Sequence, residues 1–315
     1  MTVDAEADRA ARRRTYCTLY DTAYSVNGLL MISSLLEHAT RESRVYALCL
    51  DREAAHRTLR WAEQRGEARV TVIMLDALLS ATPGLEAARA NRPHREFCWT
   101  AASAFTKHVM STATAIGSAV AYCDADLWWF SDPEICWQEM GAASIGIHEH
   151  RFPARAPQGS GYTIIQAEEK VASSGRFNVG FVGFRYDVVA LQCLARWSKQ
   201  VLDRCDAGTC GDQKYLDEWP AHFGVWLHVY ESPGVGVATW NVWGYDVRPG
   251  TPPTVDGAPT AFYHFHEHRR TPEPSAPAQF RRTLGYPLRP VDIATFYEPY
   301  ERAYLELERQ LETPV

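Results

Sequence analysis

The stretch AYCDADLWWFSDP (Ala121–Pro133) runs an apolar segment into two aspartates, Asp124 and Asp126, and then into four large hydrophobic residues at 127–130. Aspartate is a poor strand former, so this pair needs a reason to lie there. In an extended segment alternate side chains share a face, and two carboxylates aimed at one point repel each other unless a cation lies between them. The stretch therefore indicates either a local turn or a divalent-cation site. Asp132 is expected only to cap a helix that begins at Pro133.

The residues before this stretch alternate between apolar runs and helical patterns. We expect strands at 15–20, 44–50, 69–75 and 118–123, and helices at 25–38, 52–66 and 99–117. Continuous apolar strands separated by helices predict an α/β fold with a mostly parallel central sheet and helices on both faces. Ligands bind such sheets beyond the carboxyl ends of the strands, which is where the two aspartates lie.

The second half of the chain is less regular. We expect a long loop at 148–162, a strand with two glycines at 176–187, an amphipathic helix at 188–205, and further strands at 223–231 and 260–268. The expected organisation is a flexible N-terminal segment (1–14), one catalytic domain (15–268) and a C-terminal extension (269–315) with a closing helix at 297–312.

Composition limits the class of protein. The 315 residues are 46% hydrophobic and 22% charged, which is ordinary for a chain with a large core, and the net charge of −6 argues against a nucleic-acid partner. The basic run 9–14 is not followed by a secretory apolar segment, and no stretch approaches the roughly 18 apolar residues that span a bilayer. We therefore expect a soluble cytoplasmic protein without a transmembrane segment, whose cysteines are free buried thiols. The sequence gives no indication of oligomeric state.

More metal ligands occur near the other end of the chain. In YHFHEH, His264 and His266 are one residue apart on a predicted strand and so share a face. Carboxylates suit Mg²⁺ or Mn²⁺, and imidazole tilts the choice towards Mn²⁺; a pair of surface histidines is the alternative. Arg269 and Arg270 follow, either as ligands of a diphosphate or as a solvated basic turn.

Several stretches, in order along 15–268, carry a family resemblance: FCWTAASAFTKHVM, VAYCDADLWWFSDP, RFNVGFVGFR, GDQKYLDEWP, ATWNVWGY and FYHFHEH. They resemble GT-A fold glycosyltransferases, and most of all a bacterial group related to glycosyltransferase family eight. The resemblance implies a Rossmann-like nucleotide-diphospho-sugar transferase fold. It also implies transfer from a nucleotide sugar, with a UDP-sugar favoured, to an unidentified acceptor with retention of configuration. Asp124 and Asp126 would hold Mn²⁺ on the donor diphosphate with His264 or, slightly preferred, His266 as third protein ligand.

The resemblance also implies ligands for the nucleotide. Asp21 would face the base or ribose, Tyr24 would stack on the base, and Lys107 would contact donor groups. Packing at the start of a helix is the alternative for Tyr24, and an ordinary exposed position on a helix is the alternative for Lys107.

Four residues are implied at the donor sugar. Gly180 would let the sugar lie against the backbone while Asn178 binds its hydroxyls, although a bulge with a local turn would also explain these two. Asp212 would bind hydroxyls or simply cap a helix, and Gln213 would lie near the reactive face of the anomeric carbon.

Other features are open to more than one interpretation. Family eight carries His-x-x-Gly-x-x-Lys where this chain has HEHRRTP, so Arg269 or Arg270 would have to replace the lysine on the diphosphate. The segment 148–176 is our candidate lid over the acceptor, with acceptor contacts expected from His148, His150, Arg151 and Trp240. Two other functions fit the same residues: a zinc hydrolase that uses the histidines with Asp124, and a non-catalytic nucleotide-sugar-binding protein.

Overall fold

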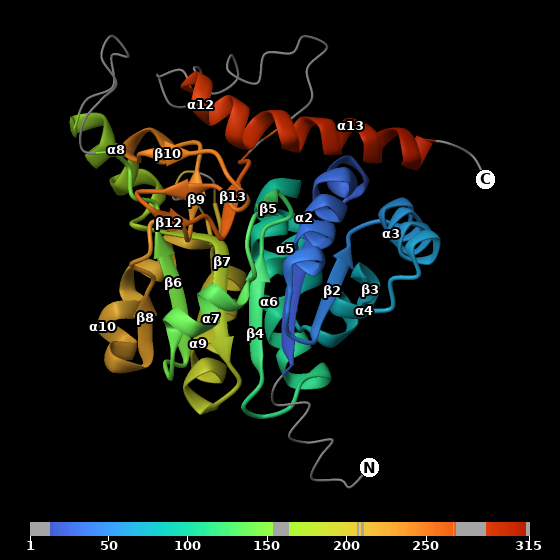
Figure 1. The fold of residues 1–315 in the computed structure, drawn as a ribbon. Coiled ribbons are helices and arrows are strands. Elements are labelled where there is room, and N and C mark those ends of the chain that lie inside the picture. Colours follow the sequence, from blue (N-terminus) through green and yellow to red (C-terminus); the bar gives the residue numbers. More distant parts are fainter. Residues whose placement is uncertain are drawn as a thin grey trace, which may run out of the picture.

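A computed structural model of the protein describes residues 13–153, 164–206, 208, 211–266, 268 and 288–312. The first half alternates strands and helices as expected (Figure 1). Its elements are β1 (Arg14–Tyr20), α2 (Ser25–His38), β2 (Ser43–Cys49), α3 (Arg52–Arg65), β3 (Val70–Met74), α4 (Leu75–Ala81), α5 (Leu85–Asn91), α6 (His94–Ala113) and β4 (Ala119–Cys123). Polar residues fix the helix ends: the Asp51 side chain accepts the Ala54 N–H at the start of α3, and Gly66, with φ +60°, ends it.

The second half adds short strands and three larger helices. Its elements are β5 (Leu127–Trp129), α7 (Glu134–Met140), β6 (Ile145–Glu149), α8 (Ile164–Ser174), β7 (Phe177–Arg185), α9 (Val188–Asp203), the 3-10 helix η3 (Gln213–Glu218), α10 (Trp219–Phe223), β8 (Leu227–Val229), β9 (Val237–Ala238), β10 (Val247–Arg248), β11 (Thr254–Val255), β12 (Ala258–Pro259), β13 (Phe262–His264), α12 (Pro290–Asp292) and α13 (Glu298–Glu312).

Seven strands form the central sheet in the order β3-β2-β1-β4-β7-β6-β8. Strand β7 is antiparallel to both of its neighbours, and the other pairs are parallel. The expectation of a mostly parallel sheet is confirmed. The carboxyl ends of β1, β2, β3 and β4 therefore meet at one edge.

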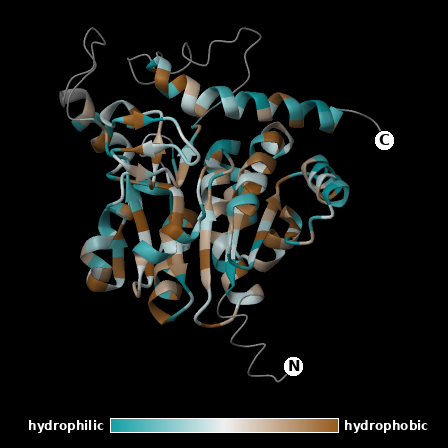
Figure 2. Ribbon diagram, viewed as in Figure 1, coloured by the Kyte–Doolittle hydropathy of each residue, from teal (hydrophilic) through white to brown (hydrophobic). Residues whose placement is uncertain are grey.

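Helices cover both faces of this sheet. Because strand side chains alternate, Tyr16 packs with α2 and α7 on one face while Cys17 packs with α6 and α9 on the other. Figure 2 shows apolar residues along the strands and polar residues on outer helices such as α3. Among the described residues, the cysteines are free and most are buried. None of the helices in the described ranges combines the length and the apolar composition that crossing a bilayer requires.

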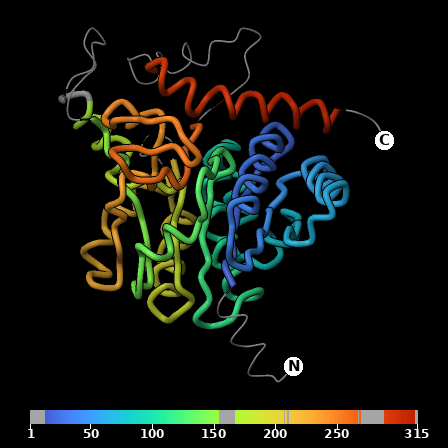
Figure 3. The backbone as a smooth tube through the Cα atoms, viewed as in Figure 1, coloured from blue at the N-terminus to red at the C-terminus, as the bar shows by residue number. Residues whose placement is uncertain are grey.

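A small second sheet, β5-β13-β9, lies beside the carboxyl edge of the central sheet. Helix α13 crosses the same end of the molecule (Figure 1, Figure 3). Its buried side chains belong to the same core as α2 and β13. The closing helix expected at 297–312 is therefore present and packs directly against the site end of the domain.

Four expected elements differ from the structure. The strand expected at 260–268 is limited to Phe262–His264. The expected loop at 148–162 begins inside strand β6, which runs to Glu149, and its residues 154–163 lie outside the described part of the chain. The strand expected at 223–231 is limited to Leu227–Val229, since α10 and a 3-10 turn precede it. The helix expected at 99–117 runs instead over His94–Ala113.

Candidate active site

Asp124 and Asp126 lie in a turn at the carboxyl end of β4. The turn closes with the Leu127 N–H donating to the Asp124 carbonyl at 3.3 Å, so the extended geometry expected for the pair is wrong. Both carboxylates nevertheless face one imidazole. His264 Nε2 lies 3.0 Å from Asp126 Oδ1 and 3.7 Å from Asp124 Oδ2. The hydrophobic residues at 127–130 anchor the turn, with Leu127 and Trp129 fully buried.

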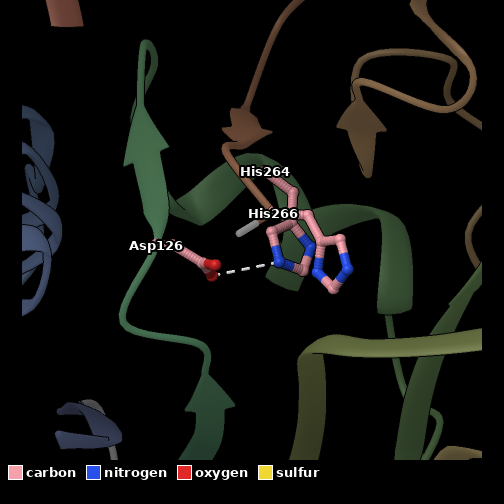
Figure 4. A group of neighbouring side chains, drawn as sticks. All are labelled: Asp126, His264 and His266. Carbon is pink, nitrogen blue, oxygen red and sulfur yellow. Dashed lines mark ion pairs between the residues drawn. The ribbon is translucent and has the colours of Figure 1, made fainter. Parts of the chain in front are cut away.

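Strand pairing explains why His264 reaches the aspartates. In the small sheet His264 is the register partner of Leu127 on β5 and of Ala238 on β9. The next residue continues this contact, because the Phe265 N–H donates to the Asp126 carbonyl at 2.8 Å. Figure 4 shows the His264 ring pointing at the Asp126 carboxylate with the His266 ring beside it.

The charges in this cluster are strongly coupled. Burial raises the pKa of the Asp124 carboxyl to about 6, with an opposing effect from the His264 charge and a further rise from Asp126. Burial also acts to raise the pKa of Asp126, but the charge and hydrogen bond of His264 lower it below its ordinary value. Burial acts to lower the pKa of His264, and its bond to Asp126 raises it above the usual histidine value. The buried Asp126 carboxylate and the half-buried Asp124 carboxylate thus both face the imidazole of His264.

The residues present fit a divalent cation. Each of three residues offers one ligand atom, and these atoms lie within 4.8 Å of one another: Asp126, His264 and His266. Asp124 borders this group. His264 Nδ1 is buried and makes no hydrogen bond within the described residues. Carboxylate oxygen with imidazole nitrogen suits Mn²⁺ better than Mg²⁺. Because both histidines lie at the site, either or both can serve as ligands.

Asn178 and Gln213 meet beside this cluster. Asn178, on β7, is buried, and its side-chain amide lies 3.2 Å from Gln213 Oε1 and 3.3 Å from His150 Nε2. The Gly180 N–H donates to Asn178 Oδ1 at 2.8 Å. The structure thus brings the two amides predicted at the donor sugar into contact with each other.

The structure gives Gly180 a different role from the one expected. A Cβ at this position would lie 2.7 Å from His264 Nδ1 and 2.7 Å from Asn178 Oδ1. Protein side chains therefore fill the space expected for a sugar. Gly180 is required because His264 packs against the backbone of β7.

Asp212 is buried at the start of η3, but its side chain makes no capping hydrogen bond there. Burial, and then the charge of Asp124, raise the pKa of its carboxyl well above the ordinary value. Because of the missing hydrogen bond, the capping alternative for the Asp212 side chain is not supported.

Tyr122 on β4, which the sequence analysis did not single out, lies near the carboxylates of Asp124 and Asp212. Burial and the charges of these two carboxylates raise its pKa.

A cavity of about 390 Å³ opens at the carboxyl ends of β1, β2 and β3. Asp21 lies in it; its Oδ1 accepts the Tyr24 N–H at 3.0 Å, and its Oδ2 lies 2.9 Å from His94 Nε2. Tyr24 is half-buried against the core at the start of α2. The other residues that line the cavity, none of which the sequence analysis singled out, are Leu50, Asp51, Leu75, Arg89, Arg92, His94 and Phe97.

Of the remaining residues predicted to contact the donor, Lys107 lies away from the site. Lys107 is exposed on α6, thirteen residues beyond His94, and a rise of about 1.5 Å per residue places it roughly 20 Å further along the helix. Because α6 leads back to the amino end of β4, the structure does not bring Lys107 to the site. Arg269 and Arg270 lie outside the described residues.

The four predicted acceptor residues divide into two pairs. His148 is fully buried on β6 and packs on the Phe262 ring, and burial lowers its pKa far below the usual value. The Arg151 guanidinium donates to the carbonyls of Tyr230, Ser232 and Val235. These two residues have structural roles.

His150 and Trp240, in contrast, lie at the site. The Trp240 ring centroid is 5.1 Å from that of His264 and 5.4 Å from that of His150, and its Nε1–H donates to the His150 carbonyl at 2.9 Å. Trp240 therefore forms one wall next to the histidines.

Tyr300, on α13, adds a residue that sequence reasoning missed. Its ring stacks on Phe265 at 3.8 Å, and its hydroxyl accepts from Asn27 Nδ2 at 2.9 Å. Burial and then the Asp126 charge raise its pKa. Helix α13 thus contributes to the surroundings of the aspartate pair.

Comparisons with known proteins identify relatives that match about four-fifths of the chain. No protein-family model matches it. The chain is 32% identical over 259 residues to the uncharacterized protein YfnD of Bacillus subtilis (strain 168). This match covers 79% of this chain and 76% of YfnD. It is 27% identical over 266 residues to the uncharacterized protein YfnF of the same organism, covering 81% of each.

Solved structures share the fold at low identity. The galactosyltransferase LgtC, crystallised with donor and acceptor sugar analogues, matches with a TM-score of 0.54 and 16% identity, over 96% of this chain and 97% of LgtC. Mouse xyloside xylosyltransferase 1 matches with a TM-score of 0.51 and 14% identity, over 82% of this chain and all of that one. The chain therefore has the GT-A glycosyltransferase fold and belongs to the protein family of Bacillus subtilis YfnD.

Proposed function

We propose that this protein is a metal-dependent glycosyltransferase that moves a sugar from a nucleotide diphosphate to the hydroxyl of an acceptor. One observation carries the proposal: Asp124, Asp126 and His264 converge at the carboxyl end of β4 in a GT-A fold. The cavity at β1–β3 lies at the same edge of the sheet, and so offers a place for the nucleoside. The family-eight resemblance favours UDP as the nucleotide.

We assign the metal to Asp126, His264 and His266, with Asp124 at its border. When bound, a divalent ion acts as a Lewis acid that stabilises charge on the departing diphosphate. Mn²⁺ is our preferred ion and Mg²⁺ the second, because imidazole nitrogen is a better ligand for manganese.

The protein's own residues orient the sugar and exclude water. Gln213 and Asp212 border the metal cluster and carry polar groups that would bind sugar hydroxyls, and Asn178 holds the Gln213 amide in place. The acceptor oxygen would bond to the anomeric carbon while the bond from that carbon to the diphosphate breaks, and the acceptor proton would leave on a diphosphate oxygen. We infer retention from the family-eight resemblance, and NMR of the anomeric proton of the product tests it.

A thermal-shift panel of UDP-, GDP- and dTDP-sugars with and without Mn²⁺ tests the function. A ligand at 100 times its Kd adds about 2.7 kcal/mol to stability, which for a chain of this size raises Tm by about 4 °C. We expect this rise only when the correct nucleotide sugar and Mn²⁺ are both present.

Asp126→Asn should abolish the joint stabilisation. Asp203→Asn, the same change at an exposed carboxylate paired with Lys199 on α9, should leave it intact. Equal shifts in wild type and Asp126→Asn would contradict the proposal. Stabilisation by Zn²⁺ with no effect of any nucleotide would favour a hydrolase, to which the same carboxylate and imidazoles are suited.

A further inference from the structure

The orientation of the Asn178 side chain follows from one unambiguous donor. A backbone N–H can only donate, so the Asn178 atom 2.8 Å from the Gly180 nitrogen must be the amide oxygen. The NH₂ group therefore faces the two remaining neighbours, Gln213 at 3.2 Å and His150 at 3.3 Å. Both neighbours must present acceptors to it.

This fixes the amide of Gln213. Its Oε1 accepts from Asn178, so its NH₂ group is directed away from Asn178. Among the described residues, no hydrogen bond involves this NH₂ group, and Gln213 is only half-buried. The polar group that Gln213 offers to a ligand is therefore a donor.

His150 completes the arrangement from the other side. Its Nε2 accepts the second hydrogen of the Asn178 amide, which requires the proton of the neutral ring to be on Nδ1. The ring is 4% exposed and is held between Phe152, stacked at 5.0 Å, and Trp240. An acceptor is thus fixed by packing at the place where the Asn178 amide needs one.

We propose that His150 is a positioning residue: together with the Gly180 N–H it fixes the Asn178 amide, and thereby makes Gln213 present its NH₂ group to the donor sugar. The inference rests on the proposed function. It assigns Gln213 as a hydrogen-bond donor to the sugar, since one lone pair of its carbonyl oxygen already accepts from Asn178.

The first test needs no activity. In protein labelled with ¹⁵N-histidine and assigned with His150→Gln, the ring of His150 should show a protonated Nδ1 and an unprotonated Nε2. In ¹⁵N-labelled protein the NH₂ signals of Asn178 should move in His150→Phe, which keeps a ring but removes the acceptor. An Nε2–H tautomer in the wild type would overturn the inference even if the protein proves to be a transferase.

The second test is kinetic, with hydrolysis of the nucleotide sugar that stabilises the wild type as the assay. His150→Phe leaves one N–H of the buried Asn178 amide without an acceptor, so we expect kcat to fall by about 10-fold with KM changed less than about 3-fold. His150→Gln, whose Oε1 can stand where Nε2 stood, should recover most of kcat. His56→Phe, the same change at an exposed histidine on α3, is the matched control; its kcat should stay within about 3-fold of wild type.

The outcomes separate this inference from the proposed function. A wild-type kcat in a folded His150→Phe protein, or equal losses in His150→Phe and His150→Gln, would overturn the positioning role. Absence of turnover with every nucleotide sugar would count against the transferase, and the tautomer measurement would still decide whether His150 accepts from Asn178.

Discussion

At residue 180 a methyl group would have no room. Gly180 lies between Asn178 and His264, and an added Cβ would approach atoms of both within 2.7 Å. Real Cβ contacts are not this short, so His264 would have to shift. Since His264 is the imidazole nearest both aspartates, one methyl group would disturb the metal site from the far side of the ring.

Gly180→Ala should therefore weaken Mn²⁺ binding by about 10- to 100-fold, as other changes behind a metal ligand do. Overpacking should also cost about 1–3 kcal/mol of stability. Titration of Mn²⁺ by EPR measures the affinity. Gly244→Ala is the control, because a Cβ there meets only Pro153, at 3.8 Å. Equal affinities in the two variants would show that His264 is not a ligand.

The buried ring of His150 gives a pH dependence with a defined sign. Burial lowers the pKa of His150 in the folded protein from 6.5 to about 3. The backbone of Arg176 and Gly175 acts to raise this pKa, and the charges of His264 and His266 act to lower it further. Below pH 6.5 the unfolded chain takes up a proton that the folded protein does not, so stability falls as the pH drops.

His150→Gln should flatten this dependence. One proton corresponds to about 1.4 kcal/mol per pH unit, and the variant should lose up to that much of the slope between pH 6 and pH 4.5. Urea unfolding in the presence of a chelator measures it. An unchanged slope would mean that His150 is charged in the folded protein.

Residue type and spacing pointed to the aspartate pair and the two histidines, because metal ligands belong to few residue types. Asn178 and Gln213 were expected from the family resemblance. Residue type and spacing did not show which of the predicted side chains are exposed to a ligand and which are buried in the protein. Arg151 and His148 carry the same chemistry as ligands, but a guanidinium that binds three carbonyls and an imidazole inside the core depend on contacts distant in sequence.

Helix α13 packs beside the site, and the sequence did not indicate this placement. A closing helix was predicted at 297–312, but the sequence does not show the surface on which such a helix packs. In the structure Tyr300 stacks on Phe265 and is tied to α2 through Asn27. The helix therefore fixes the segment that follows His264.

Tyr300→Phe should destabilise the protein by about 1–3 kcal/mol, because it leaves the buried Asn27 amide without its acceptor. Denaturant unfolding measures the change. Leu305→Ala, at a position 40% exposed on the same helix, should cost less than about 0.5 kcal/mol. A Tyr300→Phe protein as stable as wild type would show that the hydrogen bond is replaced by water.

Strand β6 shows the limit of element prediction. Its sequence, IGIHE, ends in polar residues and precedes a segment rich in Pro, Gly and Arg, which favoured a loop. The strand forms because its neighbours β7 and β8 supply hydrogen bonds on both edges and because His148 is accommodated in the core. Such pairing between distant segments is not encoded in local composition. The alternating first half was predicted well because each strand is apolar along its whole length.

At the scale of the whole molecule, the hydrophobic core extends beyond the central sheet to the C-terminal helix. Phe296, beyond the C-terminal boundary expected for the catalytic domain, is fully buried, stacks on Tyr263 at 4.6 Å and meets Phe130 edge-on at 5.4 Å. We therefore expect α13 and the sheet to unfold together.

Phe296→Ala should cost about 3–5 kcal/mol and should lower the protection of amides in β1 and β4 as much as that of amides in α13. Hydrogen exchange followed by mass spectrometry resolves the segments. If only α13 lost protection, the helix would be a separate unit that merely rests on the domain.

The placement of α13 also sets an order of events during synthesis. A chain emerging from the ribosome can form β4, β5 and β13 before residues 288–312 have left the exit tunnel, but Tyr300 cannot yet cover Phe265. Until then the aspartate pair stands beside an uncovered aromatic surface. Catalytic competence should therefore appear only after translation has passed this helix, and a prematurely terminated chain would be both inactive and prone to aggregate.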